Sequence, residues 1–421
     1  MRILVIGEGG RETAICRALA TASPRPDLVI APGNAGTARF GRNEPVSVKD
    51  IEGLVALAKR EKVDLVVPGG ETSLVLGVAD ALTAAGFPCC GPSKAAAQLE
   101  GSKIFTRTLA HAVAAPSPAF AVIRREAELI WALDAWQGGP PVMKADGLAG
   151  GKGVFLPDSR EEALAIGRRL FGGELGGAGK EVVLEERLVG VEASIFYACD
   201  GKSAVVLPHA RDHKRVGDDD KGPNTGGMGA ISPNPDVTPE VEARVRREVI
   251  EPVLAEMAKR AMPFKGFLYA GLMLTDRGPR LLEFNVRLGD PETQAVLPRL
   301  PAGAFLRLCQ GIAHGTLASV EVREDASFTC AVVLAAAGYP DAPRLGDEIY
   351  LDPALDSPFR WVDHAGARLE GDKVVTAGGR VLAVVGRGTT ATAARSAAYS
   401  GVQHVTFAGM HFRRDIGRGP V

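Results

Sequence analysis

The stretch RILVIGEGGRE, residues 2–12, decides the fold class of this chain of 421 residues. Its apolar run over 3–6 is short and bounded by a turn, which is typical of a buried strand in a parallel sheet. A glycine-rich turn follows at once and leads into a helical pattern over 11–20. This order of strand, glycine turn and helix predicts an α/β unit at the start of the chain.

The same alternation continues outward from this stretch. Apolar runs predict strands at 28–31 and 65–67, and helical patterns lie at 51–60 and 74–85. We therefore expect a doubly wound, Rossmann-like unit with right-handed crossovers. Beyond it the chain changes character, with helices expected at 104–110, 127–136, 161–170 and 239–260, and strands at 141–144, 182–185, 193–198, 204–208, 267–274 and 280–284. From about residue 328, further strands with glycine turns and a helix near 391–399 predict a third unit.

Composition and charge narrow the class of protein. The length favours about two to four domains, and 46% hydrophobic and 24% charged residues are ordinary for globular proteins. A formal net charge of −1 argues against a nucleic-acid or membrane partner, because no global field would recruit one. The six cysteines form no CxxC pair and no zinc pattern, which favours reduced core thiols in a cytoplasmic protein.

The first glycine turn has two functional interpretations. Glycines at the start of a helix let a phosphate approach backbone N–H groups, and Arg11 could balance its charge. A dinucleotide fingerprint would need a third glycine where Glu12 stands, so a nicotinamide dehydrogenase is disfavoured. A plain turn between a strand and a helix remains the alternative without function.

A second glycine-rich loop, KADGLAGGKGV at 144–154, follows a predicted strand. It differs from a Walker A loop, since Gly153 stands where Ser or Thr should follow Lys152. The loop could still cover phosphates, with Lys144 contacting them from the strand. A solvated hairpin explains the pattern about as well.

The sharpest local signal is EFN at 283–285. Residues i and i+2 of a strand face the same side, so Glu283 and Asn285 direct two oxygen atoms at one point. Mg²⁺ prefers a few protein oxygens, completed by phosphates and water. Arg287 and Asp290 follow directly and would place a cation and an acid beside such a metal. A polar strand face is the alternative.

Other polar stretches give weaker signals. The link between the strands at 182–185 and 193–198 could present backbone groups to an adenine edge, with Glu192 near ribose hydroxyls. His213 in the segment DHKR could act in acid–base chemistry, although an exposed loop histidine is the simpler expectation, and 218–220 is read as a solvated acidic run. The absence of GxSxG and the scatter of the seven histidines argue against a hydrolase triad or a zinc hydrolase.

Taken together, these motifs resemble the ATP-grasp superfamily, and within it the glycinamide ribonucleotide synthetases. The resemblance covers nearly the whole chain. It rests on GEGGRE at the start, PGNAG at 32–36, EGSK at 100–103, the loop KADGLAGGKGV, DHKR, GPNTGGMGA at 222–230, EFNVRLGDPETQ at 283–294, and HAG and GGRVL further on.

The resemblance implies an α/β protein of several domains. These are a Rossmann-like pre-ATP-grasp domain at 1–101, an ATP-grasp domain at 102–327 with a hinged lid at about 120–187, and a small C-terminal α+β domain at 328–421. It also implies ATP and Mg²⁺ (or Mn²⁺) as cofactors, glycine and phosphoribosylamine as small-molecule substrates, and a monomer.

The resemblance also implies roles for individual residues. The ATP contacts would come from Lys103, Lys144, Gly150, Gly151, Lys152, Glu185, Leu188, Glu192 and Lys214, and the metal ligands would be Glu283 and Asn285. Substrate contacts would come from Gly10, Arg11, Glu71, Asp212, Arg287 and Asp290, of which Asp212, Arg287 and Asp290 would also be catalytic.

Three departures from the family pattern stand out. Thr13 replaces the histidine of GREHA, residues 69–74 read GGETSL in place of GPEAPL, and a Gly-Gly pair at 150–151 replaces Ala-Gly. The first two touch the expected ribose-phosphate pocket. The alternatives for the whole chain are an ATP-grasp ligase with another acid and amine, and a nucleotide-binding regulator whose catalysis has decayed. The bicarbonate-using relatives of the superfamily would not be expected to carry GPNTGGMGA.

Overall fold

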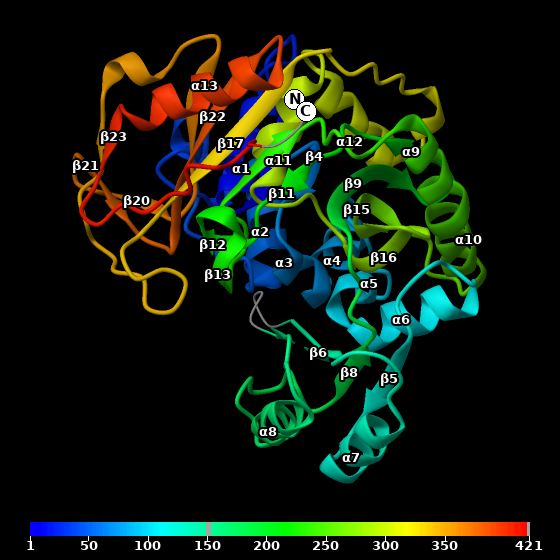
Figure 1. Cartoon of the computed structure of the whole chain (residues 1–421). Helices are drawn as coiled ribbons and strands as arrows, with labels where there is room; N and C mark the ends of the chain where they lie inside the picture. Colours follow the sequence, from blue (N-terminus) through cyan, green and yellow to red (C-terminus); the bar gives the residue numbers. More distant parts are fainter. Residues whose placement is uncertain (149–152, 419–421) are drawn as a thin grey trace.

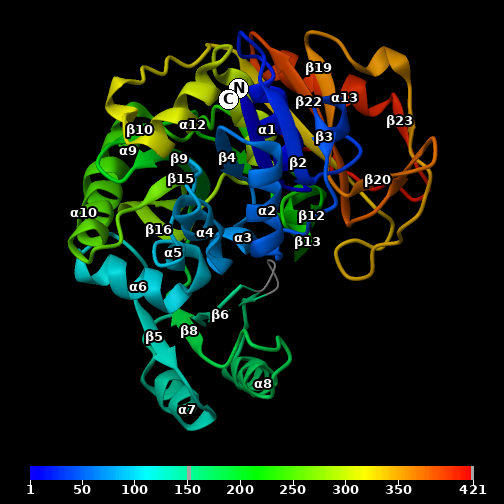
Figure 2. The ribbon, with the colours of Figure 1, turned by 180° about the vertical axis from the view of Figure 1, so that it is seen from behind.

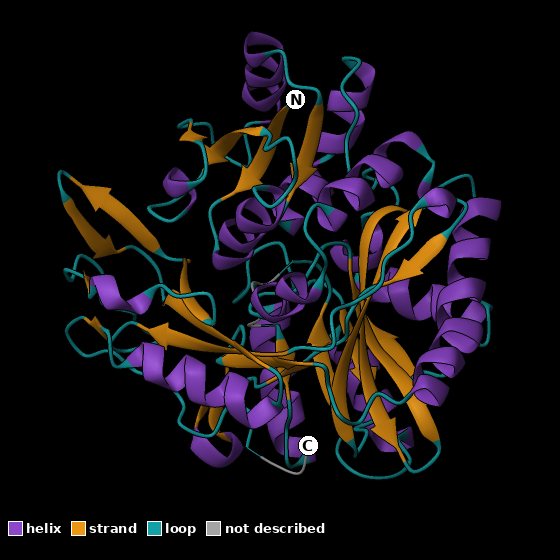
Figure 3. Cartoon of the chain, turned by 90° about the horizontal axis from the view of Figure 1, so that it is seen from above, coloured by secondary structure: helices purple, strands orange, loops and turns teal. Residues whose placement is uncertain are grey.

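The computed structural model describes residues 1–148 and 153–418. Four sheets of at least four strands carry its architecture, and helices lie against them (Figures 1 and 3). No helix within the described ranges is long and apolar enough to cross a membrane.

The first sheet has the strand order β3-β2-β1-β4, and all its pairings are parallel. Its elements are β1 (Arg2–Gly7), α1 (Gly10–Leu19), β2 (Asp27–Pro32), β3 (Arg42–Asn43), α2 (Ile51–Glu61), β4 (Leu65–Pro68), α3 (Glu71–Leu76) and α4 (Val78–Ala84). The predicted α/β unit is confirmed, with one correction. The single helix expected over 74–85 is two helices, because Gly77 adopts φ +95, a left-handed conformation that ends α3.

The second sheet is antiparallel, in the order β10-β9-β15-β16. Its strands are β9 (Val191–Asp200), β10 (Ala204–Val206), β15 (Lys265–Thr275) and β16 (Gly278–Asn285), accompanied by α5 (Gln98–Gly101), α6 (Lys103–Ala112), α9 (Pro239–Val245), α10 (Glu251–Lys259), α11 (Glu292–Val296) and α12 (Ala304–His314). A π-helical turn joins α9 to α10, so the long helix predicted over 239–260 is continuous. Its N-cap is Thr238, whose hydroxyl accepts from the N–H of Val241.

A third, smaller sheet has the order β5-β8-β6-β7 and its own apolar core. It consists of β5 (Phe120–Ile123), β6 (Val142–Ala145), β7 (Val154–Phe155) and β8 (Val182–Glu185), with α7 (Glu126–Ala135) and α8 (Arg160–Phe171). Figures 1 and 2 show this unit projecting from one end of the molecule. It is joined to the main body by Arg107, which contacts Glu185, by Lys144, which contacts the Leu282 carbonyl, and by Lys103, which contacts the Gly147 carbonyl.

The fourth sheet joins distant parts of the chain, in the order β11-β14-β17-β22-β19. Its strands are β11 (Arg211–Asp212), β14 (Gly229–Ser232), β17 (Phe328–Ala335), β19 (Arg360–His364) and β22 (Arg380–Gly388), and α13 (Ala391–Val402) packs on it. Short two-stranded sheets complete the fold: β12 (Arg215–Gly217) with β13 (Lys221–Asn224), β18 (Tyr350–Leu351) with β23 (Val405–Thr406), and β20 (Ala367–Glu370) with β21 (Lys373–Thr376). The sequence pattern did not predict that β14, which carries β11 on its other side, pairs with β17 of the third unit.

Candidate active site

A β-bulge in strand β16 shapes the centre of the site. The pairing with β15 shifts register between Gly271 and Leu272, so Leu282 is an extra residue beside Glu283. Bulges redirect side chains and leave backbone groups free of the ladder. The freed carbonyl of Leu282 accepts from Arg107 and from Lys144 Nζ at 3.2 Å. Beyond the bulge, Glu283 and Asn285 keep the two-residue spacing that places them on one face.

Glu283 is surrounded by cations. Burial alone would raise the pKa of its carboxyl, but Lys214, Lys144 and Lys103 together hold that pKa below its ordinary value. The carboxylate is therefore ionised and lies among ammonium groups. A charged oxygen and an amide oxygen on one strand face fit a divalent ion that completes its shell with phosphates and water.

Lys144 on β6 forms a buried network with Glu185 and Arg107. Its Nζ lies 2.9 Å from Glu185 Oε2, and Arg107 donates to both oxygens of Glu185 at 2.6 and 2.9 Å. Burial lowers the pKa of Lys144, and Glu185 opposes that shift. The Glu185 side chain is only 2% exposed, and both of its carboxylate oxygens are engaged by these two cations.

Two further lysines lie near the same point. Lys103, at the start of α6, donates from Nζ to the carbonyl of Gly147 at 2.8 Å and so links the main body to the third sheet. Lys214 Nζ lies 2.8 Å from Glu192 Oε2. Burial lowers the pKa of Lys214, but Glu192, Glu283 and Asp212 raise it above its ordinary value. Leu188 lies in the link between β8 and β9, while Gly150, Gly151 and Lys152 fall outside the described residues.

The predicted arginine of this site is already paired with two carboxylates. Arg287 donates to Glu71 at 3.1 Å and to Glu100 at 2.8 Å. Glu71, the first residue of α3, has a pKa of about 2, since Arg287 and Arg11 outweigh the effect of burial. Arg287 therefore connects the first sheet to the end of β16, and Glu100 is a member of the site to which the sequence motifs gave no role.

The first glycine turn lies beside Asp290. The N–H of Gly9 donates to Glu12 at 2.6 Å and that of Arg11 to Asp290 at 3.5 Å, while the Arg11 side chain donates to Glu12 at 2.7 Å. Gly10 packs so closely on Gln294 that a Cβ there would lie 2.6 Å from its Nε2. The charge of Arg11 is thus balanced by Glu12 within the protein. The sequence pattern did not predict this ion pair.

Asp212 is a half-buried acid whose Oδ1 atom is buried. Burial, reinforced by Glu292, raises the pKa of its carboxyl above its ordinary value. Its Oδ1 atom has no hydrogen-bond partner in the part of the chain that the structure describes. An uncommitted, basic oxygen in such surroundings can accept a hydrogen bond or a proton from an amine.

His213 in a loop and Thr13 in helix α1 have surroundings that the sequence did not predict. His213 is half-buried rather than exposed, and burial lowers its pKa to about 4. Thr13, which stands in place of a histidine, is buried, and its hydroxyl donates to the carbonyl of His364 at 2.6 Å. The hydroxyl of Thr13 therefore joins α1 to the C-terminal strand β19.

The residues missed at the sequence level share one property. Arg107, Glu100 and Arg380 act through partners more than 70 residues away in sequence. Arg107 lies in an ordinary helical pattern and gave no signal. Glu100 and Arg380 stand inside the quoted motifs EGSK and GGRVL, so their membership of those motifs could have singled them out.

Comparisons with known proteins match the entire architecture. Family models described as "Phosphoribosylglycinamide synthetase" match in three parts: the N domain at residues 1–100, the ATP-grasp (A) domain at 101–293 and the C domain at 329–419. The phosphoribosylamine–glycine ligase of Allochromatium vinosum is 45% identical over 421 residues, covering 99% of this chain and 98% of the relative. That of Xanthomonas campestris pv. campestris is 46% identical, covering 99% and 97%.

Solved structures agree. The crystal structure of the phosphoribosylamine–glycine ligase from Thermotoga maritima has a TM-score of 0.87 and 36% identity, covering 99% of this chain and 100% of that one. The biotin carboxylase domain of the Hydrogenobacter thermophilus 2-oxoglutarate carboxylase has a TM-score of 0.73 at 16% identity, covering 98% and 91%, and shows the shared fold alone.

The fold and the lysine-rich site define an ATP-grasp enzyme. Within that class, the chain belongs to the phosphoribosylglycinamide synthetase family.

Proposed function

We propose that this chain joins glycine to 5-phosphoribosylamine at the expense of ATP, giving glycinamide ribonucleotide, ADP and phosphate in purine biosynthesis. One observation carries the proposal: Lys103, Lys144 and Lys214 surround an ionised acid, while Asp212 and Asp290 lie in a neighbouring acidic cluster. The lysines suit a triphosphate, and the acidic cluster suits an amine. Both halves of the site are therefore needed for a reaction between an ATP-activated acid and an amine.

In the first step a carboxylate oxygen of glycine attacks the γ-phosphorus of ATP. The bond between that phosphorus and the oxygen bridging to the β-phosphate breaks, and ADP and glycyl phosphate result. The lysines offset charge on the phosphoryl oxygens, so this step depends mainly on position and electrostatics. Arg287 carries a pKa far above its usual range, owing to Glu100 and Glu71, and presents a permanent positive charge.

In the second step the amine nitrogen of phosphoribosylamine attacks the acyl carbon of glycyl phosphate. The bond from that carbon to the phosphate oxygen breaks, phosphate leaves, and the nitrogen loses a proton. We assign that proton to Asp212, whose Oδ1 is buried and without a partner among the described residues. Asp290 faces the same cluster, and we propose that it orients the amine.

We propose Mg²⁺ as the divalent ion, with Mn²⁺ as a substitute, and Glu283 and Asn285 as its protein ligands. When bound, the ion supplies charge neutralisation at the phosphates. We propose that Lys103, Lys144, Lys152 and Lys214, together with the glycines at 150–151, contact ATP phosphates. Glu185, Leu188 and Glu192 would serve the nucleoside, and Gly10, Arg11 and Glu71 would lie near the phosphoribosylamine.

We further propose the domain division 1–101, 102–327 with a lid at about 120–187, and 328–421. The third sheet supports the lid, because it has its own core and few connections to the body. A lid would exclude water from glycyl phosphate, which water would otherwise hydrolyse. The six buried free thiols support a reducing compartment, the cytoplasm, and we propose a monomer with no nucleic-acid or membrane partner.

Substrate omission tests the function directly. ADP release is measured with ATP, the metal, glycine and phosphoribosylamine, and then with each component left out. We expect full release only when all four are present. Rapid turnover with bicarbonate in place of glycine would instead assign the chain to a different ATP-grasp reaction.

A further inference from the structure

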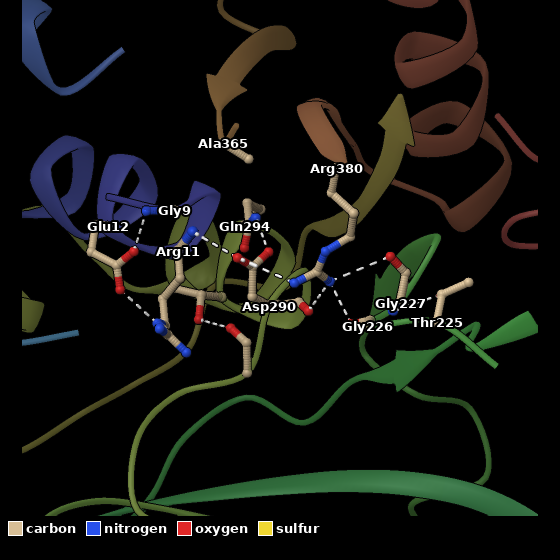
Figure 4. Close-up of polar contacts among 12 residues, drawn as sticks. Gly9, Arg11, Glu12, Thr225, Gly226, Gly227, Asp290, Gln294, Ala365 and Arg380 are labelled. Atoms are coloured by element: carbon tan, nitrogen blue, oxygen red, sulfur yellow. Dashed lines mark hydrogen bonds and ion pairs between the residues drawn. The ribbon is translucent and has the colours of Figure 1, made fainter. Parts of the chain in front are cut away.

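Arg380 connects two parts of the site that lie far apart in the sequence. It is the first residue of β22, and its Nη1 atom donates to the carbonyls of Gly226, Gly227 and Asp290 (Figure 4). Its Nη2 atom lies 3.7 Å from Asp290 Oδ2. A single guanidinium of the C-terminal unit therefore holds the glycine loop and the segment beginning at Asp290.

The glycine loop is in close contact with Asp212. Gly227 adopts φ +114, and a Cβ added there would lie 2.7 Å from Asp212 Oδ1 and 2.5 Å from Pro291 Cδ. No side chain fits between these groups, so the backbone of Gly227 forms the wall beside Asp212. A shift of this loop would change the space around the uncommitted oxygen of Asp212.

The same C-terminal unit supports the rest of the hairpin from which the loop extends. The Tyr339 hydroxyl accepts from the N–H of Gly226 at 3.1 Å. Arg413, whose side chain is 1% exposed, donates to Asp220 at 2.7 Å and to the carbonyl of Arg215 at 3.1 Å. Asp220 adopts φ 52, a left-handed conformation that a residue other than glycine keeps only where its surroundings enforce it. The hairpin is thus fixed from outside.

We propose that Arg380 is a positioning residue for the amine half of the reaction, holding the 226–227 loop and Asp290 in a fixed relation around Asp212. The inference rests on the proposed function. The planar guanidinium presents several N–H donors in a rigid arrangement, which lets one side chain serve three carbonyls and a carboxylate. A lysine in its place keeps the charge but has no second nitrogen to face the Asp290 carboxylate while the first bonds the carbonyls.

The position of Arg380 predicts which kinetic constant changes. Its contacts are to the loop and Asp290, whereas Lys103 and Lys144 contact Gly147 and Glu185 on the opposite part of the site. Arg380→Met should therefore lower kcat/KM for phosphoribosylamine on the order of tenfold to a hundredfold, as expected for misplaced reacting groups. The Kd for ATP should change by no more than about twofold.

The experiment compares Arg380→Met, Arg380→Lys and the control Arg387→Met. Arg387 lies on the same strand but pairs with Asp325 and Ser327, outside the site. Arg380→Lys should recover part of the loss, and the control should match wild type. The inference is overturned if Arg380→Met behaves like the control, or if the loss falls equally on ATP binding.

Amide exchange supplies a readout that needs no substrate. We expect faster exchange at residues 222–229 in both Arg380 variants, with Arg380→Lys used alone should Arg380→Met fail to fold. Unchanged exchange in the folded variant overturns the inference. Failure of wild type in the omission assay would count against the proposed function, whereas the exchange result concerns Arg380 alone.

Discussion

At the scale of single residues, Glu283 is the carboxylate that interacts with all three lysines of the site. It is a half-buried acid, and three lysines from separate parts of the chain favour its ionised form. Removing its charge would leave those lysines without their common counter-ion and would weaken the hold on a divalent ion.

We predict that Glu283→Gln lowers kcat by about two to four powers of ten, equivalent to about 3–5 kcal/mol of transition-state stabilisation. Asn285→Ala should lose less, because a neutral oxygen attracts a cation more weakly. Steady-state assays over a range of metal concentrations check this, and added metal should restore part of the activity of both variants.

Unfolding without ligands provides the control. Glu283→Gln should lose about 1–3 kcal/mol of stability, because the lysines lose a buried partner. If its residual activity merely followed the fraction of folded protein, the role of Glu283 would be structural. Glu251→Gln on exposed helix surface should be neutral in both assays.

The buried carboxyl of Glu100 should make the free energy of unfolding depend on pH. Burial raises the pKa of its carboxyl from 4.5 to about 7, although Arg287 opposes the shift. The folded state therefore binds the proton more tightly than the unfolded state. The stabilising contribution is fully present below pH 4.5 and is lost as the pH rises through 7, a change of about 3 kcal/mol.

We predict that Glu100→Gln removes this dependence. In urea unfolding without nucleotide or metal, wild type should gain stability relative to the variant on going from about pH 8 to pH 5. A stability difference that stays constant between these pH values would show that Arg287 keeps Glu100 ionised throughout.

At the scale of elements, Arg107 fastens helix α6 to two sheets. Its guanidinium is 2% exposed and contacts Glu185 on β8 and the carbonyls of Leu281 and Leu282 on β16. Other bonds also cross this joint, among them Ser102 to Asp146 and Lys103 to Gly147, but those are only partly buried, whereas the pair of Arg107 with Glu185 is fully buried.

We predict that Arg107→Met destabilises the protein by about 3–5 kcal/mol, because Glu185 then keeps a single buried cation, Lys144. Chemical denaturation measures the effect. The matched control is Arg168→Met, which removes an exposed ion pair with Glu126 and should cost less than about 1 kcal/mol. Equal effects in the two variants would contradict the prediction.

At the scale of the whole molecule, the fourth sheet makes the C-terminal strands part of the site. Strand β14, four residues long, pairs with β17, and Asn34 in the first unit donates to the carbonyl of His364 at 3.0 Å. A fragment ending at residue 327 would expose the edge of β14 and the apolar surface beneath it.

We predict that the fragment 1–327 aggregates or lacks a cooperative thermal transition, since it loses β17, β19 and β22. Calorimetry and size-exclusion chromatography check this. The comparison is excision of 120–185 with a short glycine linker, which is feasible because the N–H of Glu186 donates to the carbonyl of Ala119 at 2.9 Å. That variant should fold and lose ATP turnover. A soluble, cooperatively melting 1–327 fragment would contradict the prediction.

The sequence by itself determined the features that depend on near neighbours. Apolar runs and glycine turns predicted β1, β2 and β4 with the helices between them, and a two-residue period predicted that Glu283 and Asn285 share a face. Such features follow from local backbone geometry and from the need to bury one side of each element. Motifs within single segments also sufficed for the family.

Tertiary structure decided which charges meet. Three sets of contacts join residues more than 70 positions apart. They are the ion pair of Arg107 with Glu185, the hydrogen bonds from Arg380 to the carbonyls of Gly227 and Asp290, and the hydrogen bond from Thr13 to His364. The bulge that frees the Leu282 carbonyl depends on the register between β15 and β16. No local pattern encodes these contacts, because each arises from how separately formed elements pack and from the high cost of leaving a buried charge unpaired.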